Sequence, residues 1–180
     1  MGTSKSKRRV KIVESIASAI SSKKIFDTID YRNRNEDYIK QYMHQPLIKE
    51  LEDLYENLEL SKSVDQDVVK QKAKDCLLWE GDVNTTVNNF TFFGTQHRPD
   101  FVVKIDRLKV AVEVKKGESG SSLREGIGQS LVYASEFDFV VYLYVDISKD
   151  KKIRDAKMGD HEQELIEDLW DSHNVLFQVV

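Results

Sequence analysis

Apolar residues in the first half of the chain recur at the three- and four-residue steps that are typical of amphipathic helices. Such a pattern runs over residues 10–28 and weakens at the polar segment Ser21–Lys24, where we expect the helix to end. Asn35 is a suitable N-cap for a second helix, which Pro46 is expected to kink or restart. A third helix is predicted over residues 61–80.

From about residue 87 onward, the spacing changes to the two-residue alternation of strands. Residues 87–94, 99–105 and 109–115 are each predicted to form a strand, and the short IDRL turn makes the last two a hairpin. Four more elements are predicted: a helix over 122–136, a buried strand over 138–147, a helix over 160–172 and an edge strand over 174–180. This order predicts an α/β fold, in which a central mixed β-sheet is flanked by helices.

The length of 180 residues fits one globular domain with an extension. We expect a basic N-terminal arm and helix over residues 1–30 and the globular domain over residues 31–180. The single cysteine, Cys76, excludes an internal disulfide and a cysteine-based zinc site, and it fits an intracellular, cytoplasmic protein. No apolar run approaches the roughly 20 residues that cross a bilayer, so no membrane association is expected.

The charge of the chain affects which partners are plausible. A formal net charge of −4 argues weakly against a broad basic face that coats DNA. It is compatible with an active site made of carboxylates, because these groups themselves add negative charge. Basic residues are also clustered, first at the N-terminus and again over residues 104–116. A nucleic-acid enzyme is therefore consistent with the charge.

The segment over residues 109–115, KVAVEVK, places two charged residues on one face of an otherwise apolar strand. Because side chains alternate along a strand, Glu113 and Lys115 project together with Ala111, opposite the valines of the segment. Burial of these charges is costly unless they are paired or bind a metal. Asp100 begins the partner strand, and the hairpin can bring it beside Glu113.

Two adjacent carboxylates repel each other, and a divalent cation removes this conflict. Magnesium prefers hard oxygen ligands and keeps several waters. Asp100 and Glu113 would be direct ligands, joined by the Val114 carbonyl, and Lys115 could orient or acidify the attacking water. The simpler alternatives are a turn residue for Asp100 and a cross-strand ion pair on a solvated face for Glu113 and Lys115.

These motifs resemble a known family. RPDF at residues 98–101 followed by EVK at residues 113–115 resembles the PD-(D/E)xK nuclease superfamily, and Gln129 with Tyr133 forms the QxxxY pattern of some of its lineages. The upstream segment NEDYIKQYMHQPLIKEL resembles the start of the nuclease domain in the motor subunits of type I restriction enzymes. There a glutamate precedes a proline by ten residues, as Glu36 precedes Pro46 here. The resemblance covers about residues 35–147.

The resemblance implies a restriction endonuclease-like core that hydrolyses DNA with Mg²⁺ or Mn²⁺. Asp100 and Glu113 would be the metal ligands and Lys115 the catalytic lysine. Glu36 would be an accessory acid that acts through a metal-bound water, although it could also be a helix-start acid favoured by the dipole. The other acids that could take its place are Asp37, Glu50 and Glu80.

Further residues are candidates for contact with DNA. The resemblance implies that Gln129 and Tyr133 contact the DNA backbone or order the site, and the alternative is an ordinary amphipathic-helix pair. Arg98 and Lys116 flank the motif and could meet phosphates, or belong to a solvated charged surface. Other basic residues nearby are His97, Lys104, Arg107, Lys109 and Arg124.

The main expectation is a metal-dependent DNA endonuclease. The alternatives are a catalytically inactive nucleic-acid-binding module, a subunit of a larger nuclease assembly, and a protein-interaction domain with an accidental motif. The sequence lacks the GxxxxGK[ST] phosphate-binding loop of an ATP-driven motor. The nuclease would therefore act alone or within a larger complex, and a homodimer is plausible because cutting both strands often needs two active sites.

Overall fold

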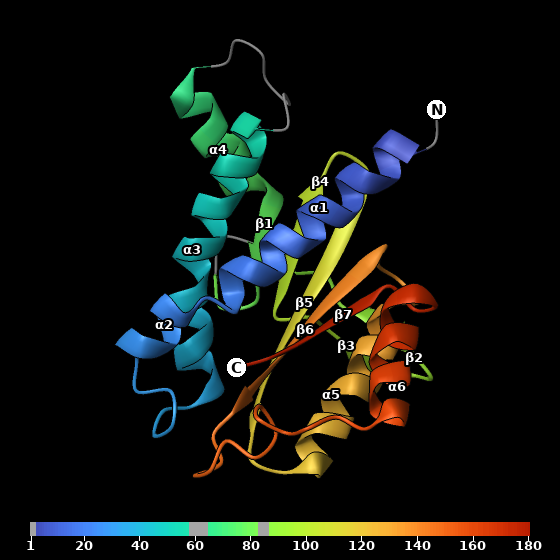
Figure 1. The fold of residues 1–180 in the computed structure, drawn as a ribbon. Coiled ribbons are helices and arrows are strands. Elements are labelled where there is room, and N and C mark those ends of the chain that lie inside the picture. The colour runs from blue at the N-terminus through green and yellow to red at the C-terminus, as the bar shows by residue number, and fades with distance from the viewer. Residues whose placement is uncertain (1–2, 58–64, 83–86) are drawn as a thin grey trace.

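The computed structural model describes residues 3–57, 65–82 and 87–180 of the chain, with side chains from Ser6 onward. A five-stranded sheet in the order β1-β4-β5-β6-β7 lies between two layers of helices (Figure 1). The strands β4 (Phe101–Ile105) and β5 (Leu108–Gly117) are antiparallel, whereas β6 (Phe139–Asp146) and β7 (Val175–Val179) run parallel to β5. The predicted α/β fold with a central mixed sheet flanked by helices is confirmed, and β7 is an edge strand as expected.

The first helical layer packs on the sheet face that carries the β5 valines. It contains α1 (Thr3–Ile20), α2 (Lys23–Thr28), α3 (Glu36–Asn57) and α4 (Gln66–Cys76). The helix predicted from residue 10 begins earlier, at Thr3, and its break at residues 21–22 lies where the sequence predicted it.

The helix α3 begins and continues for reasons that its residues explain. The N–H of Tyr38 donates to Asn35 Oδ1 at 3.0 Å, which confirms the predicted cap. The expected restart at Pro46 is wrong, because α3 continues through this residue as one helix. Met43, Leu47 and their neighbours on the same helix face are fully buried, and this burial offsets the missing hydrogen bond of the proline.

The helix predicted over residues 61–80 is shorter in the structure. Its first residues, 61–64, lie outside the described part of the chain. The helix α4 begins after Asp65, whose side chain accepts from the N–H of Asp67, and it ends at Cys76. Leu77–Trp79 then forms β1, which pairs antiparallel with β4. Although the sequence of this segment continues the helical spacing, its pairing with the otherwise free edge of β4 makes it a strand.

The single strand predicted over residues 87–94 is also wrong. Phe90–Phe92 forms β2 and Thr95–His97 forms β3, and the two pair as a separate hairpin. Phe93 and Gly94 make the turn, both with positive φ (48° and 75°). The turn is hidden in the sequence because Asn or Gly, rather than Phe, is typical of such a position.

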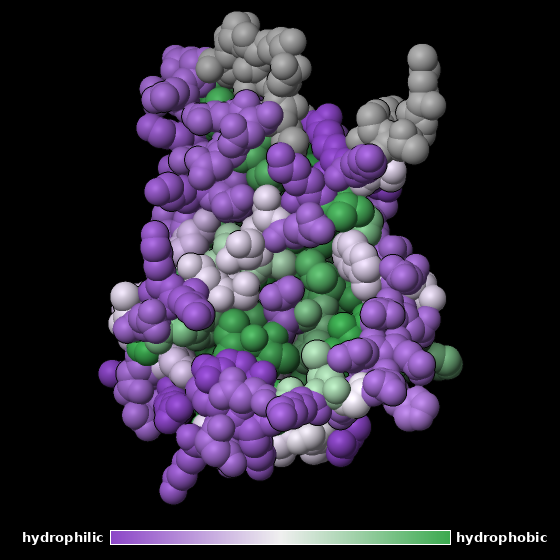
Figure 2. Space-filling model, in the orientation of Figure 1, coloured by the Kyte–Doolittle hydropathy of each residue, from purple (hydrophilic) through white to green (hydrophobic). Residues whose placement is uncertain are grey.

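The second helical layer, α5 (Gly120–Tyr133) and α6 (Asp160–Asp171), lies on the opposite face of the sheet. The alternation predicted for β5 is confirmed: Val110, Val112 and Val114 pack in the core under α1 and α3, and Ala111 packs in the core under α5. Figure 2 shows hydrophobic side chains near the centre of the face that carries α1, with hydrophilic residues around them. Among the described residues, none of the helices has the length and apolar character needed to cross a membrane.

Candidate active site

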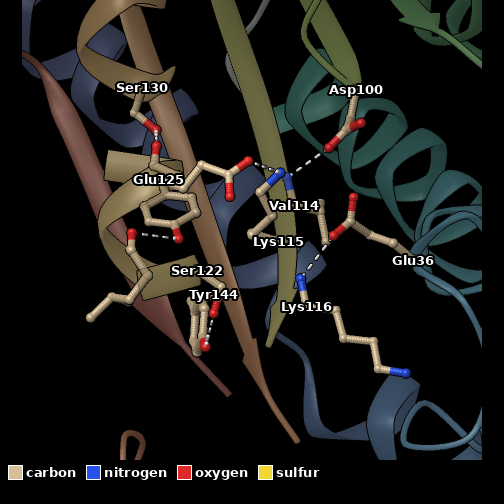
Figure 3. Close-up of polar contacts among 12 residues, drawn as sticks. Glu36, Asp100, Val114, Lys115, Lys116, Ser122, Glu125, Ser130 and Tyr144 are labelled. Atoms are coloured by element: carbon tan, nitrogen blue, oxygen red, sulfur yellow. Dashed lines mark hydrogen bonds and ion pairs between the residues drawn. The ribbon is translucent and has the colours of Figure 1, made fainter. Parts of the chain in front are cut away.

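The candidate site lies where β5 extends beyond the end of β4. The pairing of the two strands stops at Phe101 and Val112, while the rest of β5 continues beside β6. On the side that β4 has left, the N–H of Val114 donates to Asp100 Oδ2 at 2.8 Å, and the N–H of Lys116 donates to Glu36 Oε2 at 2.9 Å (Figure 3). Two carboxylates from distant parts of the chain thus bind the free edge of the sheet.

The Glu113 side chain projects from the face of the sheet that α5 covers, the same face as Ala111, as the alternation along β5 predicted. It is 5% exposed, and its Oε2 has no hydrogen-bond partner among the described residues. Burial, and then the nearby charge of Asp100, raise the pKa of Glu113 to about 9. A buried acceptor without a donor is costly, so this oxygen is suited to a ligand.

Lys115 projects from the same face of β5 as Glu113, and Figure 3 shows it on the side of the strand away from Glu36. Its Nζ is 3.4 Å from Glu125 Oε1 of α5, and its side chain is 18% exposed. The ammonium is therefore held by one exposed carboxylate and can still reach a group in solvent.

Asp100 has a strong partner that the sequence did not suggest. Lys40 Nζ lies 2.5 Å from Asp100 Oδ1, and 3.4 Å and 3.5 Å from carboxylate oxygens of Glu36 and Asp37. Burial raises the pKa of Asp100, whereas Lys40 and the N–H of Val114 lower it, with burial the larger effect. The three carboxylates in turn outweigh burial and raise the pKa of Lys40.

Sequence reasoning missed Lys40 because a lysine on an amphipathic helix is normally placed in solvent. The available signal was its position one turn after Glu36, on the same face of α3. Only the long-range contact with Asp100 distinguishes Lys40 from an ordinary surface lysine.

The remaining candidates are near the site, but most already have partners. The Tyr133 hydroxyl donates to the Arg98 carbonyl at 3.1 Å, while the Arg98 side chain pairs with Glu80. Lys116 Nζ donates to backbone carbonyls of the loop before α3, at 2.8 Å for Arg32. Gln129 Oε1, like Glu113 Oε2, is buried without a partner among the described residues.

Of the acids considered for the accessory role, Glu36 lies closest to the free edge of β5. Asp37 reaches Lys40 but its side chain is 77% exposed. Glu80 pairs with the exposed Arg98. Glu50 lines a different hollow, between α3 and the end of α1. The geometry therefore favours Glu36.

The donor set fits a hard divalent cation. Asp100 and Glu113 supply carboxylate oxygens, and Glu113 Oε2 lacks a donor among the described residues. Because the N–H and C=O of a strand residue point toward the same neighbour, the Val114 carbonyl faces the same edge as its N–H. Within the described part of the chain, no group of three or more His, Cys, Asp or Glu side chains is placed to hold a metal. Two carboxylates and a carbonyl would leave the other positions to water, as Mg²⁺ prefers.

Comparisons of this chain with protein-family models, with curated proteins and with solved structures find no match. The proposed function therefore rests on the site itself. Its defining features are two buried carboxylates, a buried oxygen on Glu113 that has no partner among the described residues, and two lysines placed around them.

Proposed function

We propose that this chain is a divalent-metal-dependent nuclease with a restriction endonuclease-like core, which hydrolyses phosphodiester bonds of DNA. The observation that carries the proposal is the buried Oε2 of Glu113, which lacks a hydrogen-bond partner in the described part of the chain, close to the buried carboxylate of Asp100. Two buried carboxylates oppose each other's ionisation, and a cation between them would reverse that effect. A purely structural strand would gain nothing from this arrangement.

Asp100, Glu113 and the Val114 carbonyl would hold the cation, which is Mg²⁺ or Mn²⁺. Such an ion supplies Lewis acidity and a more acidic bound water. Lys115 would orient the attacking water or bind a phosphate oxygen, since its Nζ has only the exposed Glu125 as a partner among the described side chains. Glu36 would position a water at the free edge of β5, because one of its oxygens already binds the N–H of Lys116 there.

Four residues are proposed to support contact with DNA. Arg98 is exposed and could exchange Glu80 for a phosphate. Gln129 lies on α5 one turn before Tyr133 and offers a buried amide oxygen, while Tyr133 and Lys116 donate to backbone carbonyls and thereby order the surrounding loops. Tyr133 and Lys116 would thus act mainly by shaping the site.

One observation favours a second candidate, a nucleic-acid-binding module without catalysis. The Lys40 ammonium, 2.5 Å from Asp100, already neutralises one proposed metal ligand. If this ion pair cannot open, a divalent cation has only Glu113 and backbone oxygens to bind. Metal affinity therefore separates the two candidates directly.

The test combines calorimetric titration with Mg²⁺ and Mn²⁺ and cleavage of plasmid and linear DNA, single- and double-stranded. The variants are Glu113→Gln and Lys115→Ala, with the exposed residues Glu118→Gln and Lys149→Ala as matched controls. We expect Glu113→Gln to lose both metal binding and cleavage. Lys115→Ala should lose cleavage alone.

The possible outcomes are distinct. Cleavage that persists in both variants would refute the assigned roles. Metal binding without cleavage by the wild type would indicate a subunit that requires a partner. Neither metal binding nor cleavage would favour the inactive module.

A further inference from the structure

The tip of the β2–β3 hairpin carries an aromatic residue, Phe93, with an exposed side chain and a left-handed backbone conformation. Phe93 is 94% exposed, whereas the other exposed large hydrophobic residues of the described chain are between 38% and 51% exposed. Its φ of 48° lies in the left-handed region, which bulky residues rarely adopt. Asn or Gly would fit this turn better and would avoid an exposed ring. The residue at this position is therefore unfavourable for folding, which suggests a role in binding.

The hairpin is fixed to the body of the protein beside the candidate site. The ring of Phe90 packs edge-on against Tyr133 and Phe137, with centroid distances of 5.9 Å and 6.2 Å. From Gly94, β3 leads directly to Asp100, and this six-residue segment spans at most roughly 20 Å. The exposed ring thus lies within a short, fixed reach of the proposed metal ligands.

A groove at the base of the hairpin has an excess of positive charge. Its polar lining consists of Asn88, Asn89, Lys104, Lys109 and one acid, Glu136, beside the ring of Phe90. The two lysines are direct cross-strand partners on β4 and β5, an arrangement that is unfavourable for like charges. Among the described residues, neither ammonium forms an ion pair, and the single acid in the lining, Glu136, leaves the groove with one more cation than anion. An anionic ligand in the groove would remove this repulsion.

The groove and the candidate site lie along the same strand. Lys109 and Glu113 project from the same face of β5, four residues apart, which corresponds to roughly 13 Å. The edge strand β1 borders both regions, since Leu78 lines the groove and Trp79 lines the pocket beside Lys40. This separation is on the order of a few nucleotides of one strand.

We infer that the β2–β3 hairpin and the Lys104–Lys109 groove bind an unpaired stretch of nucleic acid, with a base stacked on Phe93 and phosphates against the lysines. The inference rests on the proposed function, and it specifies single-stranded DNA, or the unpaired part of a duplex, as the substrate. An aromatic platform next to a cationic groove is the combination that binds single strands, and stacking requires a base whose face is free.

The surroundings of Phe93 favour this ligand over a lipid surface or a second copy of the chain. The neighbouring hairpin residues Thr91, Thr95 and Gln96 are exposed and polar. The only ring that meets Phe93 among the described residues is Phe92, edge-on at a centroid distance of 4.8 Å. Two rings among polar residues do not form the large contiguous apolar patch that protein or membrane contacts require. The groove beside it has two lysines and two asparagines against one glutamate, a lining that complements phosphates and base edges.

The experiment measures the binding of a fluorescent single-stranded oligonucleotide, and of the corresponding duplex, by anisotropy in EDTA. Phe93→Ala should weaken single-strand binding roughly 5- to 150-fold, the cost of losing one stacked base. Phe93→Trp should retain binding and show fluorescence quenching by the oligonucleotide. Leu165→Ala, an exposed hydrophobic residue on α6, is the matched control and should bind like the wild type.

Salt dependence tests the groove independently. Lys104→Ala and Lys109→Ala should each reduce the slope of log affinity against log salt by about 0.7. Phe93→Asn provides a folding control, since it suits the turn but removes the ring, and it should bind as weakly as Phe93→Ala.

The inference is overturned if Phe93→Ala binds as tightly as the wild type, or if the wild type binds no oligonucleotide. It is also overturned if the substitution instead abolishes self-association or binding to anionic vesicles. Because binding is measured without metal and without turnover, a failure of the nuclease proposal leaves this result unaffected. Conversely, cleavage that is independent of Phe93 would refute only the proposed role of the hairpin in substrate binding.

Discussion

Replacement of Lys40 by methionine would show whether its ammonium takes the place of a metal ion. Lys40 is 7% exposed, and its Nζ contacts Asp100 Oδ1 at 2.5 Å. Methionine keeps the length of the side chain but removes the charge. Asp100 is then left buried, and among the described residues the N–H of Val114 remains as its donor.

The loss of one partner from a buried ion pair costs about 3–5 kcal/mol of unfolding free energy. For a chain of this size, 1 kcal/mol corresponds to roughly 2–4 °C in Tm, so the variant should melt roughly 6–20 °C lower in EDTA. A divalent cation can then occupy the space beside Asp100. At 100 times its Kd it would restore about 2.7 kcal/mol.

The assay is thermal unfolding of wild type and Lys40→Met, each in EDTA and in Mg²⁺ or Mn²⁺, together with calorimetric titration of the cation. The exposed Lys49→Met, on the same helix, is the control. We expect the cation to stabilise the variant more than the wild type and to bind it more tightly. An equal loss of Tm with and without the cation, or weaker cation binding by the variant, would refute the competition.

Three further predictions concern single residues. Without a divalent cation, the wild type should lose stability as the pH rises from about 4.5 to about 9, because folding raises the pKa of Glu113 and the folded state retains its proton. The free energy of unfolding in urea should therefore depend less on pH for Glu113→Gln than for the wild type. Tyr133→Phe should lower the free energy of unfolding by about 1 kcal/mol, since it removes the hydrogen bond to the Arg98 carbonyl, and an unchanged urea midpoint would contradict this. Burial raises the pKa of the Cys76 thiol to about 12, so a thiol reagent at pH 8 should react only as fast as the protein unfolds; rapid labelling of the native protein would show that the site is accessible.

The sequence was sufficient for those features that depend on a local period. Alternation along β5 correctly separated Val110, Val112 and Val114 from Ala111, and the apolar segments gave the mixed sheet and its flanking helices. The IDRL turn was also sufficient to predict the hairpin that places Asp100 near Glu113. The chemical roles of these residues stay predictions.

Features that depend on tertiary contacts could not be predicted. Leu77–Trp79 continues the spacing of α4, and only the free edge of β4 makes it a strand. Phe93 occupies a turn position that its residue type disfavours, so Gly94 was the only turn signal for the β2–β3 hairpin in the sequence. Lys40 became a site residue only through its contact with a residue sixty positions away.

The carboxylates of Asp100 and Glu36 bind backbone N–H groups of β5 beyond the point where its pairing with β4 ends. These two residues can therefore be retained in evolution for a different reason than Glu113 and Lys115. If the proposed nuclease activity is correct, a lineage that no longer needs it can lose Glu113 and Lys115, because among the described residues neither side chain bonds to the backbone. Loss of Asp100 or Glu36 would instead uncover an open strand edge, which invites pairing with other chains. In inactive descendants, Asp100 and Glu36 should therefore persist as structural remnants, and the identity of the residue at position 113 should be the better marker of activity.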